Sequence, residues 1–186
     1  MFVTLVLFIG FLATWMLIPS TALEATWRAE QEQMTAMAGE GANQWVLLES
    51  ANVRADSAAS AKTSAAGLTN SRFDTWLLDR IYATLLWVSV ITYRAQALLM
   101  WSLIGIPLIL AASVDGFYVR EIRKMAFTSQ SPIRHKIGIH AFKAVSLAMV
   151  AWLCLPIPMP IVAAPAVVCF VAVSLWLWVA NLQKRL

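Results

Sequence analysis

The chain has 186 residues, of which 60% are apolar and only 13% carry a formal charge. Soluble proteins are about 45–50% apolar and about 25% charged, so these figures exclude an ordinary soluble domain, a disordered chain and a disulfide scaffold. The net charge of +4 is modest, and the basic residues lie between hydrophobic runs, which argues against a soluble nucleic-acid-binding protein.

Four apolar segments approach the roughly 20 residues that a helix needs to cross about 30 Å of hydrocarbon. They are residues 2–18, 95–114, 144–155 extended by the turn from Gly138, and 161–182. No Lys or Arg precedes the first segment, so we expect a retained anchor rather than a cleaved signal peptide. The sequence therefore predicts an all-α polytopic membrane protein with four transmembrane helices.

Residues 20–70 are polar and rich in Ala, Ser, Glu and Gln. One helix is expected to begin at the cap residue Thr21 and to end at the Gly39-Glu40-Gly41 stretch, and a second to begin at Asn43. A few short helices cannot enclose a catalytic site, so we expect a small helical outer cap or an interaction surface. The first helix should place three apolar side chains on one face: Leu23, Trp27 and Met34.

A single long helix is predicted to begin near Ser71 and to continue beyond Val114, because no helix breaker separates Ser71 from the second apolar segment. Its outer half is expected to project from the membrane or to lie against partner helices. Arg94 lies where this helix meets the hydrocarbon. We expect its side chain to snorkel to the membrane surface, or to contact a lipid headgroup or another subunit.

The distribution of charge predicts the orientation. Residues 115–143 contain six basic and two acidic side chains, whereas residues 24–80 contain five basic and eight acidic ones. Because short cytoplasmic loops are enriched in Lys and Arg, both termini are expected in the cytoplasm of a bacterial inner-membrane protein, with the acidic region outside. Three alternating prolines in residues 155–160 predict a tight helical hairpin on the outer side.

The cytoplasmic segment 115–143 is the most informative stretch. Gly116 and Ala112 form a pair of small residues that would let helices pack closely, and a break at Ser131-Pro132 begins the return to the membrane. A helical continuation would group basic side chains on one face, where they could hold anionic lipid or an acidic protein partner. The predicted partner-binding or lipid-headgroup residues are Arg94, Asp115, Gly116, Arg120, Arg123, Lys124, His135 and Lys143.

The sequence gives no support for catalysis. The two histidines, His135 and His140, are five residues apart and would diverge by about 140° on a helix, so we predict no catalytic residue, no metal site and no cofactor. Cys154 and Cys169 are expected to be small buried hydrophobes.

Two other functions compete with partner binding. A small transporter would need ionisable groups deep in the membrane, and the predicted spans contain charged residues only at their boundaries. Phe117 and Tyr118 could stack on single-stranded DNA beside the basic residues, although contact with anionic lipid is favoured over direct DNA contact.

The order of these features resembles the membrane proteins of conjugative elements typified by TraJ of certain large conjugative plasmids. The resemblance covers about residues 71–186, and residues 1–70 match only in layout. One departure is Phe142-Lys143-Ala144, where the family often has Lys-Arg. The matching features are Tyr93-Arg94, Asp115-Gly116, the basic run from Arg120 to Lys124, the turn from Ser131 to His135, Lys143, the proline hairpin 155–160, and Lys184-Arg185.

The resemblance implies an inner-membrane component of a conjugative DNA-transfer, or type IV secretion, system that binds and positions the type IV coupling ATPase. Other secretion subunits, anionic phospholipid and further copies of the chain are the remaining expected partners. The alternative is a small membrane transporter or an accessory subunit of another membrane complex. The expected layout is an anchor (1–19), an outer region (20–70), a long helix (71–114), a basic cytoplasmic loop (115–143) and a membrane hairpin with a basic C-terminus (144–186).

Overall fold

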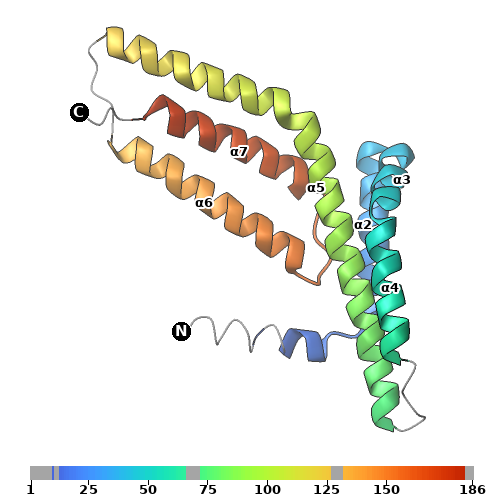
Figure 1. Cartoon of the computed structure of the whole chain (residues 1–186). Coiled ribbons are helices and arrows are strands. Elements are labelled where there is room, and N and C mark those ends of the chain that lie inside the picture. The colour runs from blue at the N-terminus through green and yellow to red at the C-terminus, as the bar shows by residue number, and fades with distance from the viewer. Residues whose placement is uncertain (1–9, 11–12, 66–71, 127–131, 183–186) are drawn as a thin grey trace. The chain divides into compact units, whose positions relative to one another are not determined.

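The computed structural model describes residues 10, 13–65, 72–126 and 132–182, and every regular element in this part of the chain is helical (Figure 1). The predicted all-α class is therefore confirmed for these residues. The labelled helices are α2 (Ser20–Ala38), α3 (Glu40–Glu49), α4 (Ala51–Ala65), α5 (Arg72–Met125), α6 (Pro132–Cys154) and α7 (Ala163–Ala180).

The chain divides into two compact units. Unit 1 comprises Met1–Gln96 together with the hairpin Leu155–Ile161, and unit 2 comprises Ala97–Cys154 and Val162–Leu186. The predicted long helix is confirmed as α5, which contributes residues 72–96 to unit 1 and the remainder to unit 2. The predicted basic loop is largely helical, because α5 continues to Met125 and α6 begins at Pro132.

The boundaries of the outer helices follow from glycine and proline. Gly39 has φ +86°, a conformation that glycine adopts without strain and that commonly ends a helix, so the predicted break between α2 and α3 is confirmed. Two details of the prediction are wrong. Pro19, in an extended conformation, occupies the N-cap position without a side-chain cap, so Thr21 lies inside the first turn. Helix α3 begins at Glu40 rather than at Asn43.

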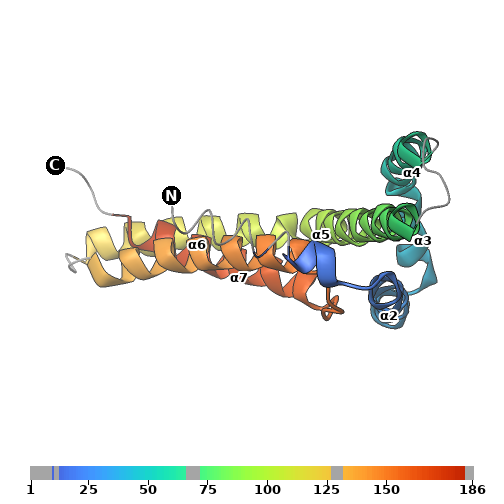
Figure 2. The same cartoon turned by 90° about the horizontal axis from the view of Figure 1, so that it is seen from below.

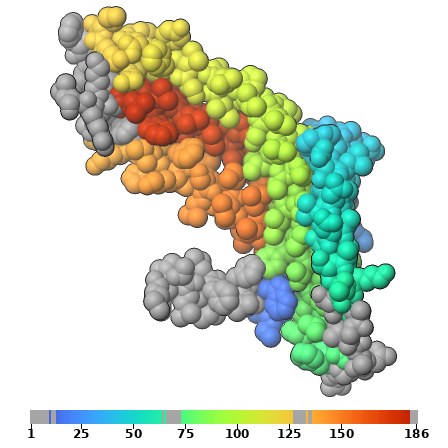
Figure 3. All heavy atoms as spheres, in the orientation of Figure 1, coloured from blue at the N-terminus to red at the C-terminus, as the bar shows by residue number. Residues whose placement is uncertain are grey.

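Unit 1 is assembled around the N-terminal half of α5. Helices α2 and α4 lie along its two flanks (Figure 2), and the surface of α4 covers one of these flanks (Figure 3). A small apolar core forms where α2 meets α5, and the end of the first apolar segment packs against it. The core consists of Leu23, Ala83 and Trp87, with Trp15, Ile18, Leu86 and Ile91 packed around it.

Unit 2 contains α6, α7 and the C-terminal half of α5, with α7 between the other two helices (Figures 1 and 3). Glycines lie where these helices approach one another. A Cβ added to Gly116 would lie 3.1 Å from the carbonyl oxygen of Trp176, and one added to Gly138 would lie 3.0 Å from the amide nitrogen of Trp178. The expectation that Gly116 allows close packing of helices is confirmed.

Among the described residues, three helices are long and apolar enough to cross a membrane: Phe73–Met125, Lys136–Cys154 and Ala163–Ala180. They contain most of the second, third and fourth predicted spans. The first predicted span, residues 2–18, lies largely outside the described residues. Each helix of unit 2 leaves much of its surface uncovered, which explains why Cys154 and Cys169 are exposed rather than buried as expected.

Candidate functional site

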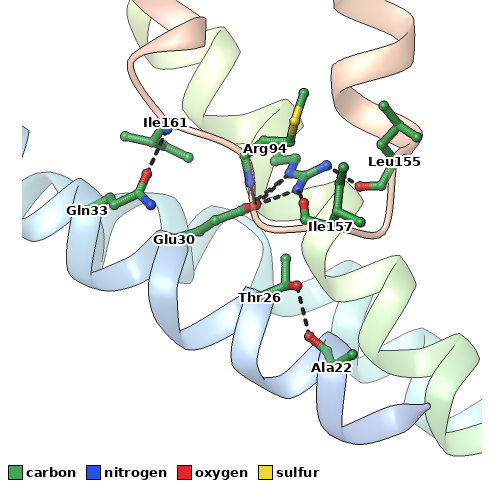
Figure 4. Close-up of polar contacts among 9 residues, drawn as sticks. Ala22, Thr26, Glu30, Gln33, Arg94, Leu155, Ile157 and Ile161 are labelled. Atoms are coloured by element: carbon green, nitrogen blue, oxygen red, sulfur yellow. Dashed lines mark hydrogen bonds and ion pairs between the residues drawn. The ribbon is translucent and has the colours of Figure 1, made fainter. Parts of the chain in front are cut away.

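The most completely buried polar site is an ion pair between Arg94 of α5 and Glu30 of α2 (Figure 4). We call this ion pair and the hairpin Leu155–Ile161 the clasp. The side chain of Arg94 is 0% exposed and that of Glu30 is 1% exposed. Nε of Arg94 donates to both carboxylate oxygens of Glu30 at 3.0 Å, and Nη2 donates to Oε1 as well. A bidentate pair of this kind fixes the orientation of both side chains.

The hairpin completes the clasp through its main chain. Nη1 of Arg94 donates to the carbonyl of Leu155 at 2.6 Å, and Nη2 donates to the carbonyl of Ile157 at 2.7 Å. In the other direction, the amide of Ile161 donates to Oε1 of Gln33 on α2 at 3.0 Å. Alternating prolines prevent the hairpin from pairing its own carbonyls in a helix, so the guanidinium supplies the donors that these carbonyls lack.

Aromatic side chains extend the clasp to α3 and α4. The hydroxyl of Tyr93 donates to Oδ1 of the buried Asn43 at 2.8 Å, and the ring of Tyr93 contacts that of Trp27 edge-on at 5.3 Å between centroids. The guanidinium of Arg54 lies 5.5 Å from the Trp27 ring, a cation–π contact. Helices α2, α3, α4 and α5 and the hairpin are therefore connected through residues at or next to Arg94.

This environment corrects the expectation for Arg94, whose guanidinium does not snorkel. It is buried because Glu30 lies on the same face of α2 as the buried side chains Leu23 and Met34. A signal for this pair was present in the sequence: an acid continues an otherwise apolar helical stripe, and an arginine interrupts an apolar run. A buried charge of either sign requires an opposite charge.

A second buried arginine, Arg80, was not anticipated. Its exposed fraction is 5%, and its Nη1 donates to the carbonyls of Trp15 (3.0 Å), Met16 (3.1 Å) and Ile18 (2.8 Å). Arginine side chains commonly bind the unpaired carbonyls at the C-terminal end of a helix. Arg80 therefore fixes the end of the first apolar segment to α5, and Nε1 of Trp15 adds a bond to Oγ1 of Thr84 at 2.9 Å.

Asp79 accompanies Arg80 at this position. Its carboxylate accepts hydrogen bonds from Nη2 of Arg80 at 2.5 Å and from the hydroxyl of Ser20 at 2.9 Å. Both bonds favour the ionised carboxylate, so the hydrogen bond from Arg80, followed by that from Ser20, lowers the pKa of Asp79 below its usual value.

The basic end of α5, in unit 2, is partly engaged within the chain. Nη1 of Arg123 donates to Oδ1 of Asn181 at 3.2 Å and to the carbonyl of Ala180 at 3.4 Å. These bonds place a cation at the C-terminal end of α7, where the helix dipole favours it. Two other predicted site residues also have partners within the chain. Asp115 accepts a hydrogen bond from Nε1 of Trp176 at 2.6 Å, and Lys124 forms an ion pair with Glu121.

The remaining predicted site residues lie near the same end of unit 2. Gly116 is buried against α7, and Arg120 is half-buried. Lys143 is exposed on α6. His135 lies within α6, but its side chain is outside the described part of the structure, as are Lys184 and Arg185.

Helix α6 presents a basic ridge that the prediction named only in part. Lys136, His140 and Lys143 are all exposed, and their spacing of four and three residues places them on one helix face. The start of α6, the end of α5 and the end of α7 lie at the same end of unit 2 (Figure 1). Basic side chains, some exposed and some partly engaged, are therefore gathered at this end.

These sites can hold helices together and present positive charge. In the described part of the chain, no group of three His, Cys, Asp or Glu side chains is placed to bind a metal ion. Within the described residues, the fold and the sites define an all-helical architecture with three membrane-length helices, a polar clasp and a cationic end.

Comparison with known proteins identifies the family. Residues 7–185 match the model of the DtrJ-like family, described as IncC plasmid conjugative DNA transfer protein DtrJ-like, and the chain belongs to that family. Neither the curated proteins nor the solved structures contain a significant match. The family match confirms the resemblance to membrane proteins of conjugative elements, and it extends over most of residues 1–70, where only the layout had matched.

Proposed function

We propose that this conjugative DNA transfer protein is a multi-pass protein of the bacterial inner membrane that binds and positions the type IV coupling ATPase. The family match carries the proposal, and the three membrane-length helices support a place in the membrane. In the proposed topology both termini are cytoplasmic, the first apolar segment crosses the membrane, and α2 to α4 lie outside. Hydrogen bonds between the hairpin and α2 support placing these two elements on the same side.

The proposed docking surface is the basic ridge Lys136, His140 and Lys143 on α6. Exposed cations at one end of the helices suit an acidic surface of an ATPase that stands in the same membrane, because complementary charge guides association and fixes orientation. The same ridge would lie at the cytoplasmic headgroups, where anionic phospholipid attracts Lys and Arg. Other secretion subunits and further copies of the chain are the additional proposed partners.

The internal contacts of Arg123 and Lys124 affect how this surface should be tested. Reversing the charge of Arg123 would remove the hydrogen bonds to the end of α7 and would disturb the fold together with any docking. Lys136 and Lys143 are exposed, so reversing their charges tests docking with little effect on stability, as is usual for surface substitutions.

The test is a Lys136→Glu/Lys143→Glu double variant in the full-length protein, with exposed Lys62→Glu on α4 as a control for loss of positive charge. We expect the amount of coupling ATPase that co-purifies from detergent to fall by about tenfold, which corresponds to about 1.4 kcal/mol of binding free energy. Mating frequency should fall with it, while the amount of the variant in the membrane stays constant. Unchanged co-purification and mating would show that the ridge is not the docking surface.

The buried charges do not favour the transporter alternative. Charges inside a membrane protein often mark a transport pathway, but Arg94 is enclosed by Glu30 and by the hairpin carbonyls of the same chain. The clasp accounts for this charge structurally.

A further inference from the structure

Two arginines on the N-terminal half of α5 each bind the end of a different apolar segment. Arg80 binds main-chain carbonyls within residues 15–18, at the end of the first apolar segment. Arg94 binds main-chain carbonyls within residues 155–157, at the end of α6. Both sites belong to unit 1, so the stretch of α5 between them connects two places where the chain meets the outer boundary of the hydrocarbon. This reading rests on the topology given under Proposed function.

The spacing of the two arginines restricts the direction of this stretch. They are 14 residues apart (80 to 94), which is about 21 Å along a helix axis. If α5 stood perpendicular to the membrane, the end of the first apolar segment would lie about 21 Å above the hydrocarbon surface. Residues 2–18 would extend about 25 Å as a helix. A segment ending about 21 Å above the hydrocarbon would therefore enter it by only about 4 Å, whereas a segment ending at its surface would nearly span the roughly 30 Å core.

The local geometry of unit 1 agrees with this restriction. The helical stretch at residues 13–17 leaves α5 across the direction of its axis, whereas α2 and α4 run alongside it (Figures 1 and 2). A membrane-crossing helix is tilted on average only about 20° from the bilayer normal. An α5 that lies crosswise to such a helix therefore lies near the plane of the membrane.

The aromatic side chains at this position, of which Phe73 and Trp76 are exposed and Trp15 is partly buried, are those of a membrane interface. Trp15, Phe73 and Trp76 form an aromatic group, with ring centroids 6.5 Å apart for Trp15–Trp76 and 5.9 Å apart for Phe73–Trp76. Phe73 is 66% exposed, although it lies outside the second predicted span. Aromatic residues gather at the boundary between hydrocarbon and water, and residues 81–93 carry no charged side chain.

We infer that residues 72–94 of α5 lie along the outer surface of the membrane, with the Trp15, Phe73 and Trp76 group among the lipid headgroups. The lipid bilayer is thus the partner of this face, and the half-helix does not project into the outer compartment. Helices α2 and α4 border it on its two flanks, where the charged side chains of Arg28, Glu32 and Lys62 are exposed.

Nitroxide depth measurements on the full chain test the inference. In a variant with Cys154→Ser and Cys169→Ser, single cysteines are introduced by Phe73→Cys and by Ile157→Cys, an exposed hairpin position at the level of Arg94. The protein is reconstituted in vesicles of phosphatidylethanolamine and phosphatidylglycerol, and collisions with oxygen and with a water-soluble nickel chelate report depth. We expect the two labels to lie at similar depth, within about one helical turn of 5 Å. A projecting helix would place the label at residue 73 about 31 Å further out.

Two further labels separate the possible failures. Arg28→Cys, on α2, should be fully accessible to the nickel chelate and calibrates the aqueous limit. Gly10→Cys, in the first apolar segment, should be accessible to oxygen and protected from the chelate. If residue 10 is protected but residue 73 is as aqueous as residue 28, the inference is overturned and the topology stands. If residue 10 is aqueous, the first segment does not cross, and the inference fails with its premise. Neither result alters the docking proposal, which co-purification tests.

Discussion

The two units are each stabilised by a different kind of contact. In unit 1, charged side chains are buried and paired with a carboxylate or with main-chain carbonyls, as at Arg94 and Arg80. In unit 2, glycines such as Gly116 and Gly138 allow the helix backbones to approach within van der Waals contact. Lipid is as apolar as the helix surfaces, so close packing of small residues favours association there. A region partly exposed to water can use directional polar contacts, provided that every buried charge is paired.

The largest effect is expected from removing the carboxylate of the clasp. Glu30→Leu would leave the guanidinium of Arg94 buried without its counter-charge, which typically costs about 3–5 kcal/mol. Thermal unfolding in detergent, followed by circular dichroism, should show a large fall in the midpoint.

Two variants sharpen this result. Glu32→Leu removes an exposed acid from the same helix and should change the free energy of unfolding by no more than about 0.5 kcal/mol. The Glu30→Leu/Arg94→Leu double variant should recover much of the loss, because replacing both partners removes the unpaired charge. Equal effects of Glu30→Leu and Glu32→Leu would refute the clasp.

Replacing a glycine by alanine is expected to have a smaller effect on stability, lowering it in unit 2 and raising it in unit 1. In Gly138→Ala the new Cβ would lie 3.0–3.3 Å from main-chain atoms of α7 at Leu177 and Trp178, so the helices must separate, at a cost of about 1–3 kcal/mol. In Gly41→Ala the Cβ meets no atom within 4 Å, and stability should rise by about 0.5–1 kcal/mol. Unfolding midpoints that rise for both variants would contradict the close approach in unit 2.

The hydrogen bond next to the clasp should contribute less than the clasp itself. Tyr93→Phe leaves Oδ1 of Asn43, which is 6% exposed, without its donor, and an unsatisfied buried acceptor costs about 1–3 kcal/mol. Tyr82→Phe is the matched control, because the Tyr82 hydroxyl bonds to Glu24 at an exposed position where water can replace it. The two variants should therefore differ in unfolding midpoint. The same midpoint in both would show that the buried Tyr93–Asn43 hydrogen bond contributes no more to stability than the exposed one.

The smallest effect is a dependence of stability on pH at Asp79. Its pKa in the folded protein is lowered by Arg80 and Ser20, so folding favours the ionised carboxylate. This contribution is present above the unfolded-state pKa of about 3.9 and is lost as pH falls through the folded-state pKa. Midpoints of the unmodified chain and Asp79→Asn should differ at pH 6, begin to approach each other below about pH 4, and converge only below the folded-state pKa of Asp79. A difference that persists at low pH would exclude this linkage.

Local rules in the sequence were sufficient for several features of the fold. No proline interrupts residues 72–106, so the N-terminal half of α5 forms without a break, and the helix continues through Pro107 to Met125. The prolines in residues 155–160 end α6 at Cys154 because each removes a main-chain donor. Composition alone predicted the membrane-length helices, since hydropathy depends on the residues of one segment and not on its neighbours.

Only the tertiary structure decided which charges are buried. Arg94 was expected at the membrane boundary, and the burial of Arg80 was not anticipated. One is paired with Glu30, 64 residues away, and the other binds carbonyls 62–65 residues away. The sequence determined the helices because helix formation depends on neighbouring residues. It did not determine the clasp, because the burial of a charge depends on a partner that folding brings from a distant segment.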